Sequence, residues 1–317
     1  MPLIFEPIVS DEHFESAARL FSAFNPSMPT TAKSLKNNVA THPPQFPAHR
    51  LLVREGTTVL GYARVVPGFW LAEPNLFSLS FFLDPQAGRW DVLPEVFDAI
   101  EALARNDGAK QLQIWVPSHY PKYTEFLKTR NYELEQSNPE SMLSLSEFDP
   151  TPYQPELVAI QNSEVRIIRL TEFAAERPET WIRDYYTWEM EVMHDVPLAG
   201  GFSEIPFDTY EKRLQSEEES PELFFVALID GEIAASTMLH RNPVDPTIGN
   251  TGLTGCRRPF RRRGLARVLK VACFAAAREA GISKIYTDNE ENNPMFQLNL
   301  DLGFREIYQH QAYGKKA

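Results

Sequence analysis

The two halves of this 317-residue chain carry matching landmarks at a nearly constant separation. An offset of this kind indicates an internal duplication, in which one structural plan occurs twice along the chain. The length also favours two domains over one. The sequence therefore predicts two copies of one fold. The landmarks are Gly56 and Gly231, 175 positions apart, Gly108 and Gly281, 173 apart, and Asn131 and Gly303, 172 apart.

In each half, short strand patterns alternate with helix patterns, which predicts an α+β fold. We place one domain at 1–148 and the other at 164–317, with a proline-rich linker at 149–163. In the first half we expect strands at 3–9, 50–55, 58–66, 75–83 and 111–116, helices at 11–21, 33–39, 91–103 and 120–128, and a closing hairpin of 131–135 with 142–145. In the second half we expect strands at 165–170, 223–229, 232–240, 248–256, 284–287 and 304–313, and helices at 180–192, 207–216, 264–280 and 292–300.

The stretch from Thr251 to Asn299 carries the strongest functional signal. A strand pattern ends in an arginine-rich turn, and a helix pattern begins after Gly264. The start of a helix leaves about four backbone N–H groups unpaired at the positive end of its dipole. Gly264 and Ala266 leave room for a phosphate to approach that backbone. The apolar stripe of the helix consists of Leu265, Val268, Leu269, Ala272, Cys273 and Ala276.

Positive charge is concentrated at this turn, although the chain has a formal net charge of −12. No acidic residue lies between Cys256 and Lys270. A polyanionic ligand, most simply a pyrophosphate, is the direct interpretation. The alternative is an ordinary buried turn whose arginines face solvent. The arginines of the turn are Arg257, Arg258, Arg261, Arg262, Arg263 and Arg267.

The run from Arg261 to Ala266, R-R-R-G-L-A, resembles the R-x-x-G-x-[GA] acyl-CoA loop of GNAT-type N-acetyltransferases. The preceding T-G-C run resembles the end of that family's fourth strand. The resemblance implies two tandem GNAT-like domains, each a mixed, mostly antiparallel sheet flanked by helices in three αβα layers. The family's downstream signature is matched by Asn292, Met295, Gly303 and Phe304.

The resemblance also implies an acyl-CoA-dependent N-acyltransferase, most simply one that moves an acetyl group from acetyl-CoA directly to a primary amine of a small molecule. Backbone N–H groups at the end of the fourth strand would polarise the thioester carbonyl. Asn292 would contact pantetheine or cap a helix, and Cys256 would act through its backbone rather than as a nucleophile. The implied cofactor-binding residues are Thr254, Gly255, Cys256, Arg261, Arg262, Arg263, Gly264, Leu265, Ala266, Asn292 and Met295.

The first half departs from this pattern. Its corresponding turn, Asp84 to Trp90, contains one arginine, one acid and one proline. Trp90 stands where Ala266 would admit a phosphate. We therefore expect the first half to bind coenzyme A poorly or not at all, and to serve as scaffold and as one wall of the substrate cleft.

The general base is sought around the predicted helix 180–192, which covers the acceptor site in the family. Our catalytic candidates are Glu191, His194 and Asp195, with Glu189 as a further acid. Each of them has the alternative of an ordinary acid or imidazole on a helix face. The acids Glu217–Glu219 are interpreted as part of a solvated loop.

The proton donor is equally open, because Asn299 stands where the family has a tyrosine. An amide cannot protonate a departing thiolate as an acid would. Tyr286 and Tyr308 are expected to be packed strand residues instead. A non-catalytic acyl-CoA-binding or sensing protein is therefore the alternative function.

The remaining composition limits partners and location. A pI near 5.2 disfavours nucleic acid as a partner of the arginine cluster and weakly suits a cationic acceptor. Two cysteines give no disulfide framework, which suits a reducing cytoplasm. We expect no signal peptide, no membrane segment and, because His194 has no Cys or His at ligand spacing, no metal. We expect a monomer or homodimer.

Overall fold

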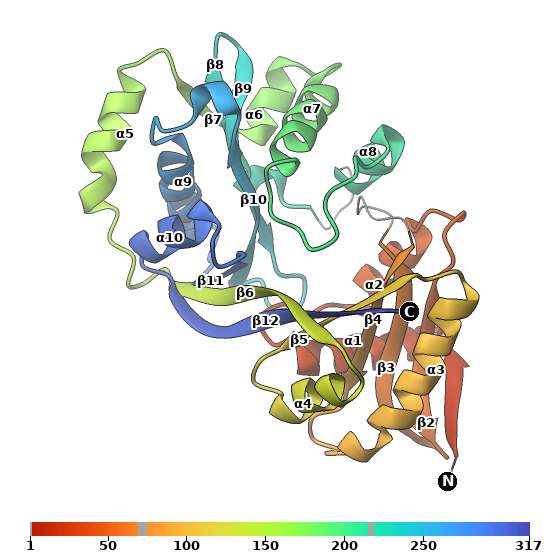
Figure 1. Ribbon diagram of the computed structural model, residues 1–317. Coiled ribbons are helices and arrows are strands. Elements are labelled where there is room, and N and C mark those ends of the chain that lie inside the picture. Colours follow the sequence, from red (N-terminus) through yellow and green to blue (C-terminus); the bar gives the residue numbers. More distant parts are fainter. Residues whose placement is uncertain (1, 69–74, 215–218) are drawn as a thin grey trace. The chain divides into compact units, whose positions relative to one another are not determined.

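The computed structural model describes residues 2–68, 75–214 and 219–317, and the chain divides into two compact units. The first unit consists of Met1–Pro139, Leu198–Ser203 and Tyr308–Ala317, and the second of Glu140–Pro197 and Glu204–Ile307. Each unit is a mixed, mostly antiparallel sheet with helices packed on it, which confirms the predicted α+β class (Figure 1). No described helix is both long and apolar enough to cross a bilayer.

The sheet of the first unit takes one strand from the far end of the chain. Its strands are β1 (Leu3–Pro7), β2 (His49–Glu55), β3 (Thr58–Pro67), β4 (Leu76–Leu83), β5 (Gln111–Pro117) and most of β12 (Arg305–Lys316). Its helices are α1 (Asp11–Phe24), α2 (Ala32–Ala40), η1 (Trp90–Val92), α3 (Leu93–Asn106) and α4 (Pro121–Thr129). The strand order is β1-β2-β3-β4-β5-β12, and only β4 and β5 pair in parallel.

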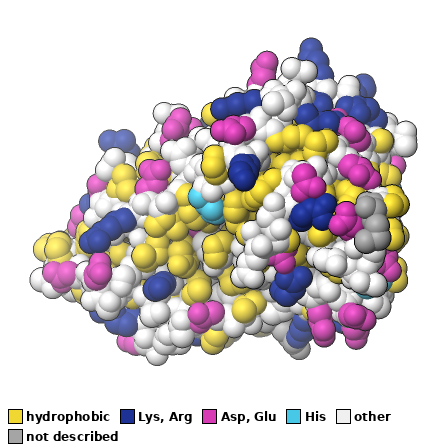
Figure 2. Space-filling model, turned by 90° about the horizontal axis from the view of Figure 1, so that it is seen from below, with side chains coloured by type: hydrophobic (Ala, Val, Ile, Leu, Met, Phe, Trp, Pro, Cys, Tyr) yellow, Lys and Arg dark blue, Asp and Glu magenta, His cyan; other side chains and the backbone are white. Residues whose placement is uncertain are grey.

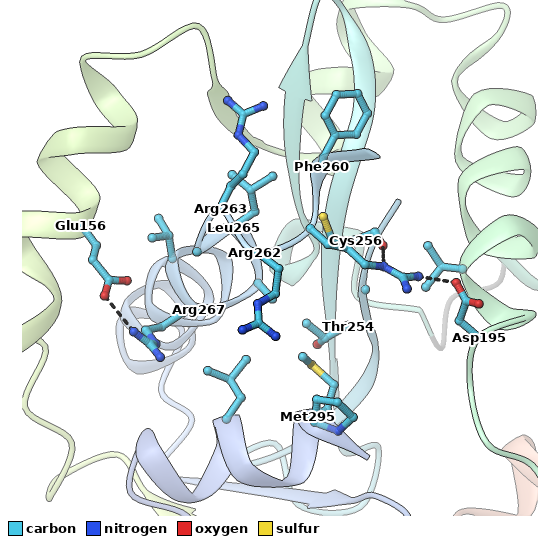
Figure 3. A pocket seen from close by; sticks show the side chains of 18 of the residues that line it. Glu156, Asp195, Thr254, Cys256, Phe260, Arg262, Arg263, Leu265, Arg267 and Met295 are labelled. Atoms are coloured by element: carbon cyan, nitrogen blue, oxygen red, sulfur yellow. Dashed lines mark hydrogen bonds and ion pairs between the residues drawn. The ribbon is translucent and has the colours of Figure 1, made fainter. Parts of the chain in front are cut away.

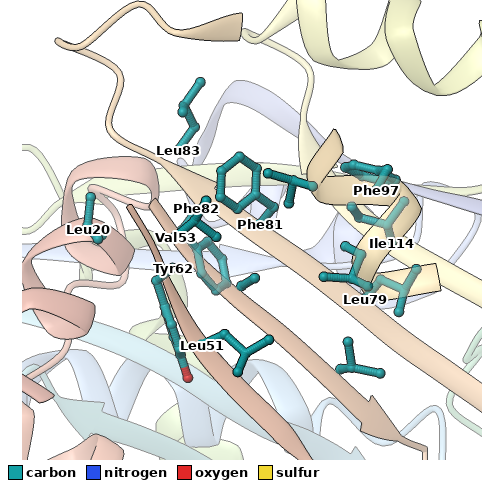
Figure 4. Close-up of a cluster of buried hydrophobic side chains, with 14 of the residues drawn as sticks. Leu20, Leu51, Val53, Tyr62, Leu79, Phe81, Phe82, Leu83, Phe97 and Ile114 are labelled. Carbon is teal, nitrogen blue, oxygen red and sulfur yellow. The ribbon is translucent and has the colours of Figure 1, made fainter. Parts of the chain in front are cut away.

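The core of the first unit combines aromatic and aliphatic side chains, several of them from β3 and β4 (Figure 4). Tyr62 and Phe82 are register partners on β3 and β4, and their rings stack with centroids 5.6 Å apart. Phe24 of α1 packs edge-on against Phe82 on this face. Side chains alternate along a strand, so Phe81 faces the other side, where Phe97 of α3 is buried. The two helices thus cover opposite faces.

The second unit contains the predicted functional stretch. Its strands are the end of β6 (Glu133–Ser144), β7 (Arg166–Arg169), β8 (Phe225–Ile229), β9 (Glu232–Arg241), β10 (Ile248–Cys256) and β11 (Lys284–Asp288). Its helices are η2 (Thr151–Tyr153), α5 (Gln154–Gln161), α6 (Leu170–Glu176), α7 (Trp181–Met193), α8 (Phe207–Leu214), η3 (Pro221–Leu223), η4 (Arg258–Phe260), α9 (Leu265–Glu279) and α10 (Pro294–Asp301). The strand order is β6-β11-β10-β9-β8-β7.

Helices α9 and α7 pack on opposite faces of β9 and β10. Leu239 of β9 belongs to the apolar cluster that includes Leu269 of α9. Ser236, which points the other way along the same strand, contacts the Tyr185 hydroxyl of α7 at 3.0 Å. The sheet face covered by α9 therefore makes an apolar contact here, whereas the face covered by α7 makes a polar one.

Two strands are shared between the units. The first seven residues of β6 lie in the first unit, whereas Glu140–Ser144 pair antiparallel with β11 in the second. β12 begins in the second unit, and its residues 310–316 pair with β5 in the first. The predicted hairpin of 131–135 with 142–145 is therefore wrong, because 140–144 pair with β11 and the region is one continuous strand.

The compact units are not the contiguous stretches 1–148 and 164–317, since each takes in a segment from the other part of the chain. The segment 149–163, expected as a linker, contains η2 and α5. Pro152 and Pro155 are the second residues of these helices, within the first turn, where a missing N–H costs nothing. The expected helix 207–216 ends at Leu214, and residues 215 and 216 lie outside the described part.

Candidate functional site

The arginine-rich turn is shaped by two left-handed residues. Arg262 has φ 64° and Gly264 has φ 77°, while η4 precedes them. A β-carbon on Gly264 would meet nothing closer than a Glu156 oxygen at 3.7 Å, so the glycine is required by its φ and not by crowding. Gly264 is the N-cap of α9 and gives no side-chain cap, which leaves the first N–H groups of the helix available.

A pocket of about 940 Å³ opens in front of this turn (Figure 3). It is lined by β10, the turn, α9, the end of α7, α10 and α5, all from the second unit. Every cofactor-binding residue that the sequence predicts, except Asn292, lies in its lining. Arg267, predicted among the arginines of the turn, also lines the pocket. The lining residues that sequence reasoning missed are Glu156, Ala159, Ile160, Val192, Val196, Phe260, Val268, Asn293, Pro294 and Leu298.

Strand β10 separates from β11 beside the pocket. The two strands pair in parallel from Ile248 to Asn250, and no further register partners join them in the described residues. A bulge in β10 between Thr251 and Thr254 shifts its register against β9. The end of β10 therefore has one paired edge, towards β9, and one open edge.

Peptide groups of Thr254 and Cys256 face the open edge. Arg257 donates its N–H to the carbonyl of Ala234 on β9, and peptide directions alternate along a strand. The N–H groups of Thr254 and Cys256 then point away from β9. Consistently, the Cys256 carbonyl accepts a hydrogen bond from Arg261 Nε at 3.0 Å rather than from a strand. These outward N–H groups are donors available to a ligand carbonyl.

Helix α7 lies directly against the backbone of β10. A β-carbon on Gly255 would be 2.1 Å from Val192 Cγ1, a distance that real contacts do not reach. Glycine at this position thus allows α7 to form a wall of the pocket beside the open strand edge. Among the implied cofactor residues, Gly255 is needed for packing, a role that only the structure reveals.

Acidic side chains from other segments pair with most of the arginines. Asp195 hydrogen-bonds to Arg258 at 2.5 Å and to Arg261. Those hydrogen bonds, and the arginine charges, hold the pKa of Asp195 at about 2. The cluster is therefore less positive than the sequence alone indicates.

Two further acids come from the segment around α5. Glu164 pairs with Arg263, and Glu156 Oε1 lies 2.8 Å from Arg267 Nη1. Arg262 has no ion-pair partner in the part of the chain that the structure describes, and its side chain extends into the pocket (Figure 3). Arg262 is thus the guanidinium most available to an anionic ligand.

The three catalytic candidates are all engaged in ion pairs. Glu191 Oε2 is 2.9 Å from Arg257 Nε, and exposed His194 is 3.4 Å from Glu204. Of the three, only Asp195 lines the pocket. Their role as the base stays a prediction, and the low pKa of Asp195 weighs against that residue. Buried Glu189 binds Tyr210 and Arg213, at 2.8 Å each, instead.

The asparagines near α10 have structural partners. Asn293, not Asn292, caps α10 by accepting from the Met295 N–H at 3.0 Å, and Asn293 lines the pocket. Exposed Asn292 hydrogen-bonds to Glu290. Asn299 is buried and donates to Asn289 at 2.6 Å, so it braces the loop before α10.

The two tyrosines expected to be packed are held differently. The hydroxyl of Tyr308 is 2.8 Å from Ser27 within the first unit. Tyr286 on β11 is half-buried, and burial together with the charges of Glu140 and Asp245 raises its pKa. Burial raises the pKa of the Cys256 thiol to about 11, which agrees with its expected non-nucleophilic role.

The corresponding turn of the first unit is closed by its own side chains. Arg89 pairs with Glu55 and Asp91, at 2.7 and 2.9 Å. Trp90 packs against Tyr120 and Tyr123. Arg89, the one arginine of this turn, is therefore already paired with carboxylates. Weak coenzyme binding by this unit stays a prediction.

The described residues contain no group of three or more His, Cys, Asp or Glu side chains placed to hold a metal ion. On the face drawn in Figure 2, basic and acidic side chains are interspersed rather than gathered by sign. A surface of this kind does not provide the continuous basic stripe typical of nucleic-acid binding.

Residues 175–304 match the model of the acetyltransferase (GNAT) family. Mycothiol acetyltransferase from Rhodococcus erythropolis is 22% identical over 275 residues, which are 84% of this chain and 85% of that protein. Residues 175–304 contain β10, the arginine-rich turn and α9.

Solved structures share the fold along nearly the whole chain. A tandem GNAT protein from the clavulanic acid biosynthesis pathway superposes with a TM-score of 0.76 at 17% identity, covering 99% of this chain and 98% of that one. A GCN5-related N-acetyltransferase from Sphaerobacter thermophilus gives 0.72 at 17% identity, with 99% and 95% covered. The fold of this chain, with its two units, is therefore shared with these structures.

Proposed function

We propose that the protein is a GNAT-type acetyltransferase that transfers an acetyl group from acetyl-CoA to a primary amine of a small molecule, a proposal supported by the match of residues 175–304 to that family's model. The coenzyme occupies the pocket in front of α9. Its pyrophosphate lies against the backbone of 262–267, and its thioester lies beside the open edge of β10. Arg262 supplies additional positive charge.

The proposal rests on one observation above all: the uncapped start of α9 opens into a cavity of about 940 Å³ beside an unpaired strand edge. An uncapped helix start favours phosphate, and outward strand N–H groups favour a thioester carbonyl. The N–H groups of Thr254 and Cys256 would stabilise the oxyanion that forms when the amine attacks. A site suited to the pyrophosphate and a site suited to the thioester, two parts of the same coenzyme, thus lie in one pocket.

A primary amine is proposed as the acceptor because a solved structure with this fold is a GCN5-related N-acetyltransferase, whereas the family model and the relative's name indicate acetyl transfer alone. A non-catalytic acyl-CoA sensor is the second candidate, and buried Asn299 in place of an acid is the observation that favours it. The two functions differ in whether bound acetyl-CoA ever loses its acetyl group.

Calorimetric titration with acetyl-CoA, followed by a thiol-release assay over a panel of amines, tests the proposal. We expect one-to-one binding and amine-dependent release of coenzyme A. Binding without thiol release on any amine would establish the sensor function. Absence of binding would remove both.

Arg262→Ala provides a matched test of the site. We expect about a tenfold weaker affinity for acetyl-CoA, because one charge-assisted contact to phosphate is lost. Arg305→Ala removes an exposed arginine that pairs only weakly with Glu147, at 3.4 Å, and should leave the affinity unchanged. Equal affinities of the two variants would place the phosphates elsewhere.

A further inference from the structure

A histidine–carboxylate pair lies on the α7 face of the sheet, beside the bulge of β10. His240 Nδ1 is 3.0 Å from Glu219 Oε2. β9 is regular from residue 235 to 241, so His240 projects to the same face as Ser236, which contacts α7. The acids Glu217–Glu219 were interpreted as a solvated loop; Glu217 and Glu218 lie outside the described residues, whereas Glu219 is largely buried, with a side chain 14% exposed.

The other ring nitrogen of His240 faces the backbone of the bulge. A β-carbon on Gly252 would lie 2.6 Å from His240 Nε2. Any residue other than glycine at position 252 would therefore displace the imidazole ring. Nε2 has no hydrogen-bond partner among the residues that the structure describes. Gly252 precedes Thr254 by two residues, roughly 7 Å along a strand. The imidazole thus stands next to the strand segment that presents the outward N–H groups.

The pair has the arrangement of a base and its orienting carboxylate. A carboxylate at Nδ1 fixes the tautomer with the proton on Nδ1, which leaves the Nε2 lone pair free to accept. Burial alone would raise the pKa of Glu219, but its hydrogen bond to His240 and the charge of Arg213 hold that pKa below its usual value. Glu219 therefore stays ionised and keeps His240 oriented.

Other ionisable groups approach His240 from the neighbouring elements. Asn250 on β10 is the register partner of His240, and Tyr286 on β11 is the partner of Asn250, so all three side chains share one face. Asp288 and Glu140 follow on that face, as register partners on β11 and β6. From α8, Arg213 reaches Glu189 of α7 and acts on Glu219 through its charge. These acids favour a cationic amine near His240.

We propose that His240, oriented by Glu219, is the general base that deprotonates the acceptor amine, directly or through one water at the β10 bulge. This inference rests on the proposed acetyl transfer. It places the acceptor on the α7 face of β10.

The proton transfers balance as follows. Nε2 takes one proton from the acceptor ammonium, and the free amine nitrogen attacks the thioester carbonyl carbon. The C–N bond forms and the C–S bond breaks, with its electron pair leaving on sulfur. The second amine proton passes to the thiolate, and the imidazolium returns its proton to solvent. The products are the amide, free coenzyme A and one proton.

His240→Gln is the test, compared with His49→Gln as a matched control. His49 also pairs with a carboxylate, Asp107, at 2.7 Å, but belongs to the first unit. For His240→Gln we expect kcat/KM for the amine to fall about 100-fold near pH 7, with acetyl-CoA affinity within twofold of the unaltered protein. The control should keep both values.

The pH profile separates a base from a structural residue. The deficit of His240→Gln should shrink as pH rises, and with an acceptor whose nitrogen is already unprotonated at neutral pH, because less proton removal is then required. Glu219→Gln should lower kcat about tenfold, and added imidazole should partly restore His240→Ala.

Three results would overturn the inference: an unchanged rate in His240→Gln, a deficit independent of pH and acceptor, or joint loss of activity and acetyl-CoA binding. If the unaltered protein transfers acetyl groups in any of these cases, only the assignment of His240 falls. If it transfers to no amine, the proposed function itself fails.

Discussion

Because Gly255 has no side chain, helix α7 can pack directly against strand β10. The added methyl group of Gly255→Ala would overlap Val192 Cγ1, so α7 must move away from β10. We expect a loss of about 2 kcal/mol in the free energy of unfolding, typical of an overpacked core, and a weaker affinity for acetyl-CoA. Urea unfolding and calorimetry measure the two effects.

The double variant Gly255→Ala with Val192→Ala tests the cause. Removing the two Val192 methyl groups makes room for the new one, so the double variant should be more stable than the sum of the single changes predicts, by about 1 kcal/mol or more. Additive losses would mean that the strain of Gly255→Ala arises from some other neighbour.

Residue-scale inference from sequence worked where the cause is local. Gly264 was predicted at the turn where a helix begins, and it is the N-cap of α9 with a φ of 77°. Gly255 was assigned only a backbone role, because the helix that excludes its side chain lies over 60 positions earlier. His240 was not singled out at all, since neither Glu219 nor Gly252 is near it in sequence.

At the scale of elements, α5 brings a negative charge to the phosphate site. Glu156 pairs with Arg267, and its other oxygen, Oε2, is buried without a hydrogen bond in the described residues. This carboxylate competes with an anionic ligand for Arg267. For Glu156→Gln we expect acetyl-CoA affinity to rise about threefold to tenfold at low salt, with a smaller gain at high salt.

Calorimetry at two salt concentrations measures this effect. Glu176→Gln is the control, because Glu176 also pairs with an arginine, Arg166 at 2.6 Å, but lies outside the pocket lining. A fall in affinity for Glu156→Gln would show instead that Glu156 positions Arg267 for the phosphate.

Sequence reasoning placed most strands and helices but misjudged 149–163 and 131–145. The prolines of 149–163 were interpreted as marking a linker, whereas Pro152 and Pro155 lie in the first turns of η2 and α5. Glu156 of the first segment pairs with Arg267 and so reduces the positive charge of the arginine cluster, an effect that the local sequence around the arginines does not reveal. The second segment was expected to close on itself, but a distant strand, β11, provides its partner.

At the scale of the whole chain, the C-terminal strand is tied to α3 by a buried ion pair. Glu101 is 1% exposed, and Lys315 Nζ lies 3.0 Å from it. Burial alone would raise the pKa of Glu101, but hydrogen bonds from Arg130, Lys315 and Arg105 hold it at about 2. This value is below the ordinary 4.5, so the stabilisation is fully present above pH 4.5 and is lost as pH falls towards 2.

Urea unfolding at pH 7 and pH 3 checks this dependence. The total linked to Glu101 is on the order of 3 kcal/mol, most of which should disappear between the two pH values. In Glu101→Gln the acid-induced loss between pH 7 and pH 3 should be smaller by about 2 kcal/mol, although the variant is less stable at pH 7. Glu125→Gln, which removes an exposed acid of α4, should titrate like the unaltered protein.

The shared strands predict that the two parts of the chain do not fold from contiguous fragments. A fragment of residues 1–148 lacks β12, so β5 loses its antiparallel partner and the core loses Tyr313, which is 3% exposed. Losing that burial and a strand ladder should cost at least about 3 kcal/mol.

We expect the fragment to be largely unfolded by circular dichroism, and a peptide of residues 305–317 to restore its structure on titration. A peptide with Tyr313→Ala and Lys315→Ala should restore much less. A fragment that folds equally well without the peptide would show that β12 is dispensable to the first unit.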